Sequence, residues 1–236
     1  MATLPFEVIV MAGGRGERLS PLTDNCPKPL LLVGDRPILE YSILRLIRAG
    51  IKDFSFCVNY LGEQIEGHFG DGERWNARFT HIYEPRPLGT IGGAALKTNF
   101  RFEDLLVING DLLTTINYEK FYAFFLEEEA DIAVATIPYR VNLPYGILHQ
   151  NDQREVTHLD EKPSYTYYIN SGMYFLRKEI LELIPENTRL DAVALIHLAI
   201  DRGCKISAFP LRDYWLDIGQ MEDFKRAQED IQFIDW

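Results

Sequence analysis

Short apolar segments alternate with amphipathic segments through the first half of the chain. Val8–Ala12 is apolar throughout, as in a strand buried on both faces, whereas Pro37–Ala49 places apolar residues three and four apart, as in a helix. Such alternation predicts βαβ units, right-handed crossovers and a mostly parallel sheet with helices on both faces. The expected strands are Val8–Ala12, Phe54–Val58, Phe79–Tyr83, Leu105–Asn109 and Ile132–Ile137, and the expected helices are Pro37–Ala49, Glu63–Phe69, Gly92–Thr98 and Tyr118–Glu128.

The second half of the chain has a different pattern. Tyr145–His149, Val156–Leu159 and Tyr167–Leu176 are typical of strands and are separated by turn residues. We therefore expect antiparallel pairs that form a small lid beside the main sheet. Helix Val193–Asp201, strand Ile206–Phe209 and helix Met221–Ile231 are expected to complete the fold. The whole pattern predicts one α/β domain over residues 1–236, with a Rossmann-like, doubly wound, mixed sheet.

The first strand runs into a loop that combines glycines with cations. The glycines are Gly13, Gly14 and Gly16, and the cations are Arg15, Arg18 and Lys28. Backbone N–H groups in such a loop form a concavity for anions, and nearby cations strengthen it, so the loop predicts a phosphate-binding site. The loop lacks the P-loop motif, and Leu19 stands where a dinucleotide fingerprint has its third glycine. A nicotinamide-dependent oxidoreductase is therefore disfavoured.

Composition narrows the class of protein further. The net charge of −11 over 236 residues argues against a nucleic-acid-binding surface. Cys26, Cys57 and Cys204 form no C-x-x-C pair, and no secretory signal or membrane-length apolar run is present, so we expect a cytoplasmic protein with no membrane partner. A polyanionic ligand on an acidic chain requires local compensation of charge, and this conflict predicts a divalent cation.

Two carboxylates are candidates for holding that cation. Asp111 ends an apolar strand at the edge of the sheet where ligands bind, and Asp217 lies among apolar neighbours. From the residues alone, Asp111 serves equally well as a metal ligand or as a solvated residue in a turn. Asp217 serves as a second ligand or as the N-cap of the last helix. Glu161 and Lys162 alone would be an exposed ion pair.

Nine segments in order resemble the sugar-1-phosphate nucleotidyltransferases, the sugar-nucleotide pyrophosphorylases, over nearly the whole chain. MAGGRGERLSPLT and PKP form the loop, and they are followed by PILEY, NYLGEQI, PLGTIGGA, NGD, PYG, EKP, NSGMY and YWLDIG. The MAGG form of the loop looks most like mannose-1-phosphate guanylyltransferase-like members. The resemblance implies that an NTP and a sugar 1-phosphate react to give an NDP-sugar and pyrophosphate, with residues to about 140 binding the nucleotide and residues from about 141 binding the sugar.

The resemblance also assigns residues. It implies catalytic roles for Arg15, Lys28, Asp111 and Lys162, and Mg²⁺ as a cofactor held by Asp111 and Asp217. The nucleotide is expected at Ala12, Gly13, Gly14, Arg15, Gly16, Glu84, Leu88, Gly89 and Thr90, and the sugar phosphate at Asn109, Gly146, Glu161, Lys162 and Asn170. A non-catalytic, nucleotide-sugar-sensing subunit of the same fold is the alternative, and a homodimer is left open by the sequence.

The choice of base rests on Glu84. An ionised carboxylate only accepts hydrogen bonds, and guanine offers two adjacent donors, N1–H and the N2 amino group. Uracil and thymine offer one donor, whereas adenine N1 and cytosine N3 are acceptors. We therefore expect GTP first, UTP or dTTP second, and ATP and CTP last. The alternative is that Glu84 faces solvent and that backbone groups read the base.

Overall fold

A mixed sheet of seven strands forms the centre of the molecule. The structure, a computed structural model, describes residues 4–234 and 236. The strand order is β12-β8-β11-β6-β1-β4-β5, and of the six neighbouring pairs only those of β11, with β6 and β8, are antiparallel. The mostly parallel, doubly wound sheet predicted from the sequence is confirmed. The strands are β1 (Phe6–Met11), β4 (Asp53–Val58), β5 (Arg78–Tyr83), β6 (Asp104–Asn109), β8 (Ile132–Asn142), β11 (Ser164–Arg177) and β12 (Ile206–Pro210).

Both faces of the sheet are covered, which explains why β1 is apolar at nearly every position. Val8 and Val10 point into a core built with helices α1 (Ile38–Arg48), α2 (Gly62–Phe69) and α3 (Tyr118–Glu127). Ile9 and Met11 point into a second core, on the side of helix α4 (Ala192–Asp201). Successive residues of a strand face opposite sides, so a strand buried on both faces has no polar alternation. Helix α5 (Met221–Asp230) packs on a third, smaller cluster near the C-terminus.

Most expected elements are present, with changes at their ends. The expected helix Gly92–Thr98 is a short 3₁₀ helix, Gly92–Leu96, and β8 continues to Asn142 instead of ending at Ile137. Two short strand pairs were not predicted, and one of them, β7 (Leu112–Thr114) with β13 (Trp215–Asp217), brings the two candidate metal ligands together. The other pairs β2 (Leu32–Val33) with β3 (Arg36–Pro37). Strands of two or three residues are too short to produce a recognisable pattern.

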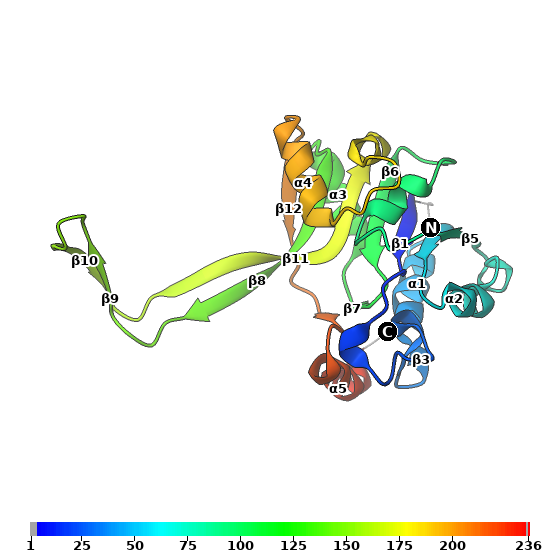
Figure 1. The fold of residues 1–236 in the computed structure, drawn as a ribbon, viewed down its shortest axis with the longest axis horizontal. Helices are drawn as coiled ribbons and strands as arrows, with labels where there is room; N and C mark the ends of the chain where they lie inside the picture. The colour runs from blue at the N-terminus through cyan, green and yellow to red at the C-terminus, as the bar shows by residue number, and fades with distance from the viewer. Residues whose placement is uncertain (1–3, 235) are drawn as a thin grey trace.

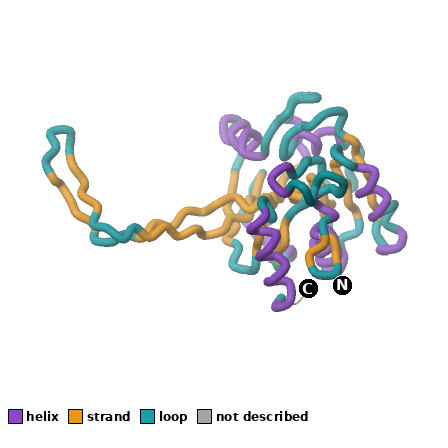
Figure 2. The backbone as a smooth tube through the Cα atoms, turned by 60° about the horizontal axis from the view of Figure 1, so that its bottom comes forward, coloured by secondary structure: helices purple, strands orange, loops and turns teal. Residues whose placement is uncertain are grey.

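The antiparallel strands of the second half project from the body instead of lying over the sheet. Beyond Thr136 and Asn170, β8 and β11 pair only with each other among the described strands, and a second hairpin, β9 (Ile147–Gln150) with β10 (Val156–Asp160), continues outward. We call residues 137–169 the arm. The arm stands clear of the body in two views (Figures 1 and 2). The expected antiparallel pairs are therefore present, but in this chain they do not close over its own sheet.

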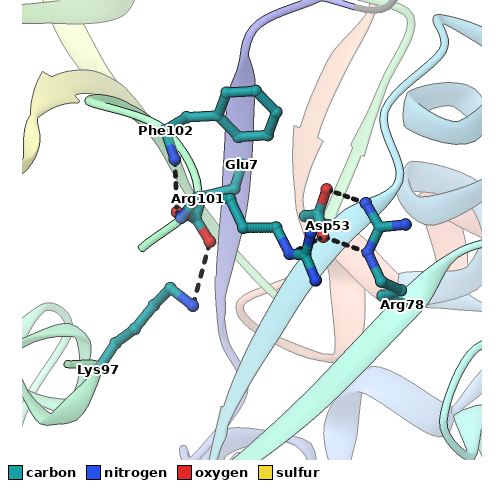
Figure 3. Close-up of polar contacts among 6 residues, drawn as sticks. All are labelled: Glu7, Asp53, Arg78, Lys97, Arg101 and Phe102. Atoms are coloured by element: carbon teal, nitrogen blue, oxygen red, sulfur yellow. Dashed lines mark hydrogen bonds and ion pairs between the residues drawn. The ribbon is translucent and has the colours of Figure 1, made fainter. Parts of the chain in front are cut away.

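A cluster of charged side chains lies at the amino ends of β1, β4 and β5 (Figure 3). Glu7 is buried, and one of its carboxylate oxygens accepts the backbone N–H of Arg101 at 2.8 Å, while the other lies 3.0 Å from Nζ of Lys97. Asp53 is paired with Arg78 and Arg101. These charges satisfy one another and fix the amino ends of the strands. In the described residues no helix has the length and apolarity needed to cross a membrane.

Candidate active site

A cavity of about 610 Å³ lies at the carboxyl ends of β1 and β6, where open α/β sheets bind ligands. Segments that are far apart in the sequence form its walls: the glycine loop after β1, the loop after β5, the turn after β6 and the approach to α4. All nine residues predicted to bind the nucleotide line this cavity, together with Lys28, Asn109 and Asp111; further wall residues are Met11, Glu17, Arg18, Pro29, Pro87, Gly110, Arg189 and Asp191.

The glycine loop is held in place by its own side chains. Gly16 has φ of +67°, and a Cβ there would lie 3.0 Å from the methyl group of Thr23, whose hydroxyl donates to the Gly16 carbonyl at 2.9 Å. Leu19 is fully buried in the third cluster, which anchors the middle of the loop. Arg15 remains exposed, with its guanidinium 5.4 Å from the ring centre of Tyr60. The loop is therefore held in one conformation, in which its backbone and Arg15 line the cavity.

Lys28 and the two carboxylates meet below this loop. The buried Lys28 places Nζ 2.5 Å from Oδ2 of Asp111. Asp217 reaches the same place through the pairing of β7 with β13, although it is not a wall residue of the cavity. Burial and the Asp111 charge raise the pKa of Asp217 to about 6, whereas Lys28 and Arg18 lower it. Gln220 is the N-cap of α5, so Asp217 does not have that role.

The carboxylates suit a divalent cation. Oδ1 of Asp111 and Oδ1 of Asp217 are both buried and have no hydrogen-bond partner among the described residues. A buried, unpaired carboxylate oxygen is costly, and Mg²⁺ is commonly held by one or two carboxylates together with substrate phosphates. Within residues 4–234 and 236, no group of three or more His, Cys, Asp or Glu side chains could hold a metal by itself. The donor set therefore fits Mg²⁺ arriving with a nucleotide.

The loop after β5 is built around Glu84. Its side chain is 6% exposed, and its Oε2 accepts the backbone N–H of Leu88 at 2.9 Å. Burial raises the pKa of Glu84, and the Leu88 N–H opposes that rise. A Cβ on Gly13 would lie 3.1 Å from its Oε1, and a Cβ on Gly93 only 2.3 Å. Glu84 thus lines the cavity between two glycines and does not point into open solvent.

The same loop is fastened to the start of α4. Gly89 has φ of +83°, and a Cβ there would lie 2.5 Å from the carbonyl oxygen of Leu190. The N–H of Thr90 donates to Asp191 at 3.1 Å, and its hydroxyl accepts from the N–H of Ala192 at 2.9 Å. These contacts bring Arg189 and Asp191 to the wall of the cavity. The sequence analysis missed both residues, because they follow no strand and belong to no recognisable motif.

The residues expected to bind the sugar phosphate are divided between two places. Asn109 lines the cavity, and Asn170 lies at the root of the arm, where its side-chain oxygen accepts the N–H of Gly172 at 2.9 Å. Gly146, Glu161 and Lys162 gather at the outer part of the arm: a Cβ on Gly146 would lie 3.2 Å from Oε2 of Glu161. The Glu161 and Lys162 side chains are each 68% exposed, and their charged atoms are 3.9 Å apart.

A doubly wound sheet with a cavity and a glycine loop at its carboxyl edge is typical of nucleotide-binding α/β proteins. The family model described as nucleotidyl transferase matches residues 7–233, and the chain belongs to this family.

Relatives with different nucleotides are similar to this chain. A mannose-1-phosphate guanylyltransferase of Mycobacterium tuberculosis is 30% identical over 98% of this chain and 66% of its own length. A UTP–glucose-1-phosphate uridylyltransferase of Synechocystis is 26% identical over 94% of this chain and 62% of its own length. A D-glycero-α-D-manno-heptose 1-phosphate guanylyltransferase of Aneurinibacillus thermoaerophilus is 29% identical over 96% of this chain and 99% of its own length. The chain thus spans about two thirds of the first two relatives.

Solved structures share the fold. A structure titled HddC of Yersinia pseudotuberculosis, complexed with GMP-PN, is 27% identical, has a TM-score of 0.73 and is matched over 95% of this chain and 99% of that one. A putative glucose-1-phosphate thymidylyltransferase of Bacillus anthracis has a TM-score of 0.78 at 21% identity, matched over 98% of this chain and 97% of that one. The family and the fold are shown by these likenesses, and the choice of nucleotide differs among the relatives.

Proposed function

We propose that this chain transfers a guanylyl group from GTP to a sugar 1-phosphate and releases pyrophosphate. The observation that carries the proposal is the meeting, in one cavity, of the glycine loop with Arg15, the Lys28–Asp111 pair and the buried Glu84. Family membership supports the reaction class. Several relatives are named guanylyltransferases, which supports GTP, and the uridylyltransferase among them makes UTP the runner-up.

The reaction needs positioning more than proton transfer. An oxygen of the sugar phosphate forms the new bond to the α-phosphorus, and the bond from that phosphorus to the bridging oxygen of pyrophosphate breaks. The attacking oxygen is already ionised at neutral pH, so no general base is required. In this proposal Arg15 binds the β and γ phosphates, Lys28 lies near the α-phosphate, and Lys162 holds the sugar phosphate. Each cation offsets repulsion between two anionic substrates and favours the charge distribution of in-line transfer.

In this proposal Asp111 and Asp217 hold Mg²⁺. One oxygen of each carboxylate is buried and has no hydrogen-bond partner among the described residues. When bound, the metal supplies Lewis-acid stabilisation of phosphate oxygens. Asp111 would exchange part of its contact with Lys28 for the metal, which frees the ammonium group for a phosphate. We retain the division of the domain proposed from the sequence, with the nucleotide bound mainly by residues to about 140 and the sugar by residues from about 141.

A matrix of pyrophosphate-release assays tests this proposal. GTP, UTP, dTTP, ATP and CTP are each paired with mannose, manno-heptose and glucose 1-phosphates in the presence of Mg²⁺. We expect GTP to give the highest kcat/KM, by about tenfold or more if one buried hydrogen bond decides the base. UTP or dTTP should follow, with ATP and CTP last. Preference for ATP or CTP would overturn the assignment of guanine, and inactivity with every pair would favour the sensing subunit.

A further inference from the structure

The ribbon of the arm has one wholly apolar face and one that is mostly polar. Residues opposite each other in an antiparallel pair share a face, and the face alternates along each strand. Tyr167 lies opposite Tyr139, whereas Thr166 lies opposite Arg140. The apolar face consists of Ile137, Tyr139, Val141, Tyr165, Tyr167 and Ile169, and the other face of Ser164, Asn142, Thr166, Arg140, Tyr168 and Pro138.

The apolar face of the ribbon is not covered by its own chain. Tyr139 is 55% exposed and Tyr167 57% exposed. Of the 17 large apolar side chains that are exposed in the described residues, nine belong to residues 139–169. An isolated two-stranded hairpin is marginally stable in water, and contiguous apolar patches of this kind mark contact sites. The arm therefore requires another surface to pack against.

The arm also carries the missing part of the candidate active site. Lys162 and Glu161 lie beyond the six ribbon residues 164–169, which extend roughly 20 Å at the rise of a β-strand. The segment that holds them joins β10 to β11, and both views show the junction of these strands well away from the body (Figures 1 and 2). The walls of the cavity, in contrast, include no residue of the arm. Within one chain, the nucleotide-side residues and Lys162 are thus separated.

We propose that the arm of a second copy of this chain packs against the body and places its Glu161 and Lys162 in the cavity of the first copy. This inference rests on the proposed function, because that function assigns these two residues to the sugar phosphate. It explains two observations with one contact: the uncovered apolar face of the ribbon and the cavity that has no arm residue in its wall.

Two features favour a second copy as the partner of the arm: the symmetry of homodimers and an exposed apolar surface beside the cavity. Most homodimers have a two-fold axis, so each arm would serve the cavity of the other copy. Helix α4 begins just after the wall residue Asp191 and leaves Val193 and Ile200 exposed on one side, seven residues apart, so apolar side chains are exposed on a helix that adjoins the cavity. The apolar face of each ribbon exposes Tyr139, Tyr165 and Tyr167, and tyrosine is a residue type that protein–protein interfaces favour.

Solution mass with matched arm variants is the first test. The wild-type chain should show at least twice its 27.2 kDa mass by light scattering. Tyr167→Lys and, separately, Tyr139→Lys put a charge on the apolar face and should lower the mass toward that of the monomer. Tyr168→Lys puts the same charge on the opposite face of the ribbon and should leave the mass unchanged. A wild-type monomer at assay concentration that is fully active would overturn the proposal.

Crosslinking tests the placement of the arm without using activity. In a background of Cys26→Ser and Cys204→Ser, one copy carries Lys162→Cys and another carries Arg189→Cys at the cavity wall. A short bismaleimide should join the two copies and give a band of twice the chain mass on a denaturing gel. Lys178→Cys, placed where β11 pairs with the start of β6, should not crosslink to Arg189→Cys. Absence of the band from the first pair would contradict the proposal, whether or not the chain is a guanylyltransferase.

Complementation between two inactive variants tests the shared site. Asp111→Asn removes the cavity function and Lys162→Ala removes the arm function, so each variant alone should have little activity. When the two are co-expressed, a mixed dimer has one cavity with both parts intact, and about a quarter of wild-type activity should return for random pairing of equal amounts. If each chain used its own arm, mixing would restore nothing while the wild type remained active. If the wild type itself were inactive, the proposed function would fail, and the crosslink would still decide the placement.

Discussion

Nζ of Lys28 lies 2.5 Å from Oδ2 of Asp111, while Oδ1 of the same carboxylate is buried and has no partner among the described residues. Only one of the two carboxylate oxygens of Asp111 therefore has a partner in the described part of the chain. Lys28 neutralises the carboxylate through one oxygen, the other oxygen is left without a partner there, and the charge of Asp111 acts on Asp217. This arrangement is expected where a metal ion completes the site only when substrate is bound.

Asp111→Asn should abolish most of the turnover. The substitution removes the negative charge that serves both Lys28 and Mg²⁺ and replaces one of the two oxygens by an amide donor, so we expect kcat/KM to fall by about 100-fold or more. Pyrophosphate release measured across a Mg²⁺ titration checks this expectation, and the Mg²⁺ requirement should shift to higher concentration. Asp213→Asn, an exposed position before β13, is the matched control and should retain full activity. Unchanged turnover in Asp111→Asn would remove this residue from the metal site.

The raised pKa of Asp217 predicts that the free energy of unfolding depends on pH. Its pKa is raised to about 6 in the fold, above the unfolded value of about 3.9, so the folded state binds the proton more tightly. The metal-free protein should therefore lose stability from this group as pH rises from about 4 to about 6, with the full loss present above 6. Asp217→Asn removes the charge and should stabilise the metal-free protein at pH 7.5 by on the order of 1 kcal/mol after screening by solvent.

Thermal melts of wild type and Asp217→Asn at pH 4 and pH 7.5, with EDTA, measure the effect. The difference between the two proteins should be small at pH 4 and larger at pH 7.5. Addition of Mg²⁺ and GTP should reverse the order, because the wild type gains more from binding. A wild type that is more stable than Asp217→Asn at pH 7.5 without metal would mean that the carboxylate is stabilised in the fold, contrary to this prediction.

The sequence predicted the parts of the site that lie in continuous motifs. The glycine loop and the loop after β5 each follow a strand, so their residues meet at one edge by topology alone. Asp217 was identified as a candidate ligand, but its path to Asp111 runs through β7 and β13, which are too short to recognise. The position of the arm could not be predicted either. Alternation within β8 and β11 sets their faces, but it does not say whether a paired ribbon folds over its own sheet or extends away from it.

Gly89→Ala should damage the nucleotide site through the backbone. The position has φ of +83°, and the added methyl group would lie 2.5 Å from the Leu190 carbonyl oxygen. We expect a loss of roughly 1–3 kcal/mol of stability and a raised KM for the nucleotide, because the loop can no longer stay fastened to α4. Urea unfolding and nucleotide kinetics provide the two measurements. Gly67→Ala, in helix α2 with open space around it, should be neutral or slightly stabilising.

Lys97→Met should destabilise the fold without changing the chemistry. It leaves the buried carboxylate of Glu7 without its 3.0 Å ion-pair partner. Breaking a buried pair from one side costs about 3–5 kcal/mol, which urea unfolding would detect easily. Lys178→Met breaks the exposed pair with Glu103 and should cost less than about 1 kcal/mol. Because this cluster (Figure 3) lies at the amino ends of the strands and the cavity lies at their carboxyl ends, kcat for the folded fraction should remain that of the wild type.

Glu84→Gln tests how the base is selected. One oxygen of Glu84 is engaged by the Leu88 N–H, and the side chain lines the cavity, so the proposed contact to the base is assigned to its other oxygen. A glutamine can keep the contact to Leu88 with its carbonyl, but it then presents an amide donor where guanine also presents donors. The preference for GTP over UTP should therefore fall by about 10- to 100-fold, since an unpaired buried donor costs roughly 1–3 kcal/mol.

The ratio of kcat/KM for GTP to that for each other NTP measures the change. ATP and CTP offer acceptors at the position where guanine has N1–H, so their relative kcat/KM should rise as that for GTP falls. Glu63→Gln, exposed in α2, makes the same chemical change away from the cavity and should leave every ratio unchanged. If the ranking in Glu84→Gln stayed that of the wild type, backbone groups would read the base, and Glu84 would serve only to hold the loop through Leu88.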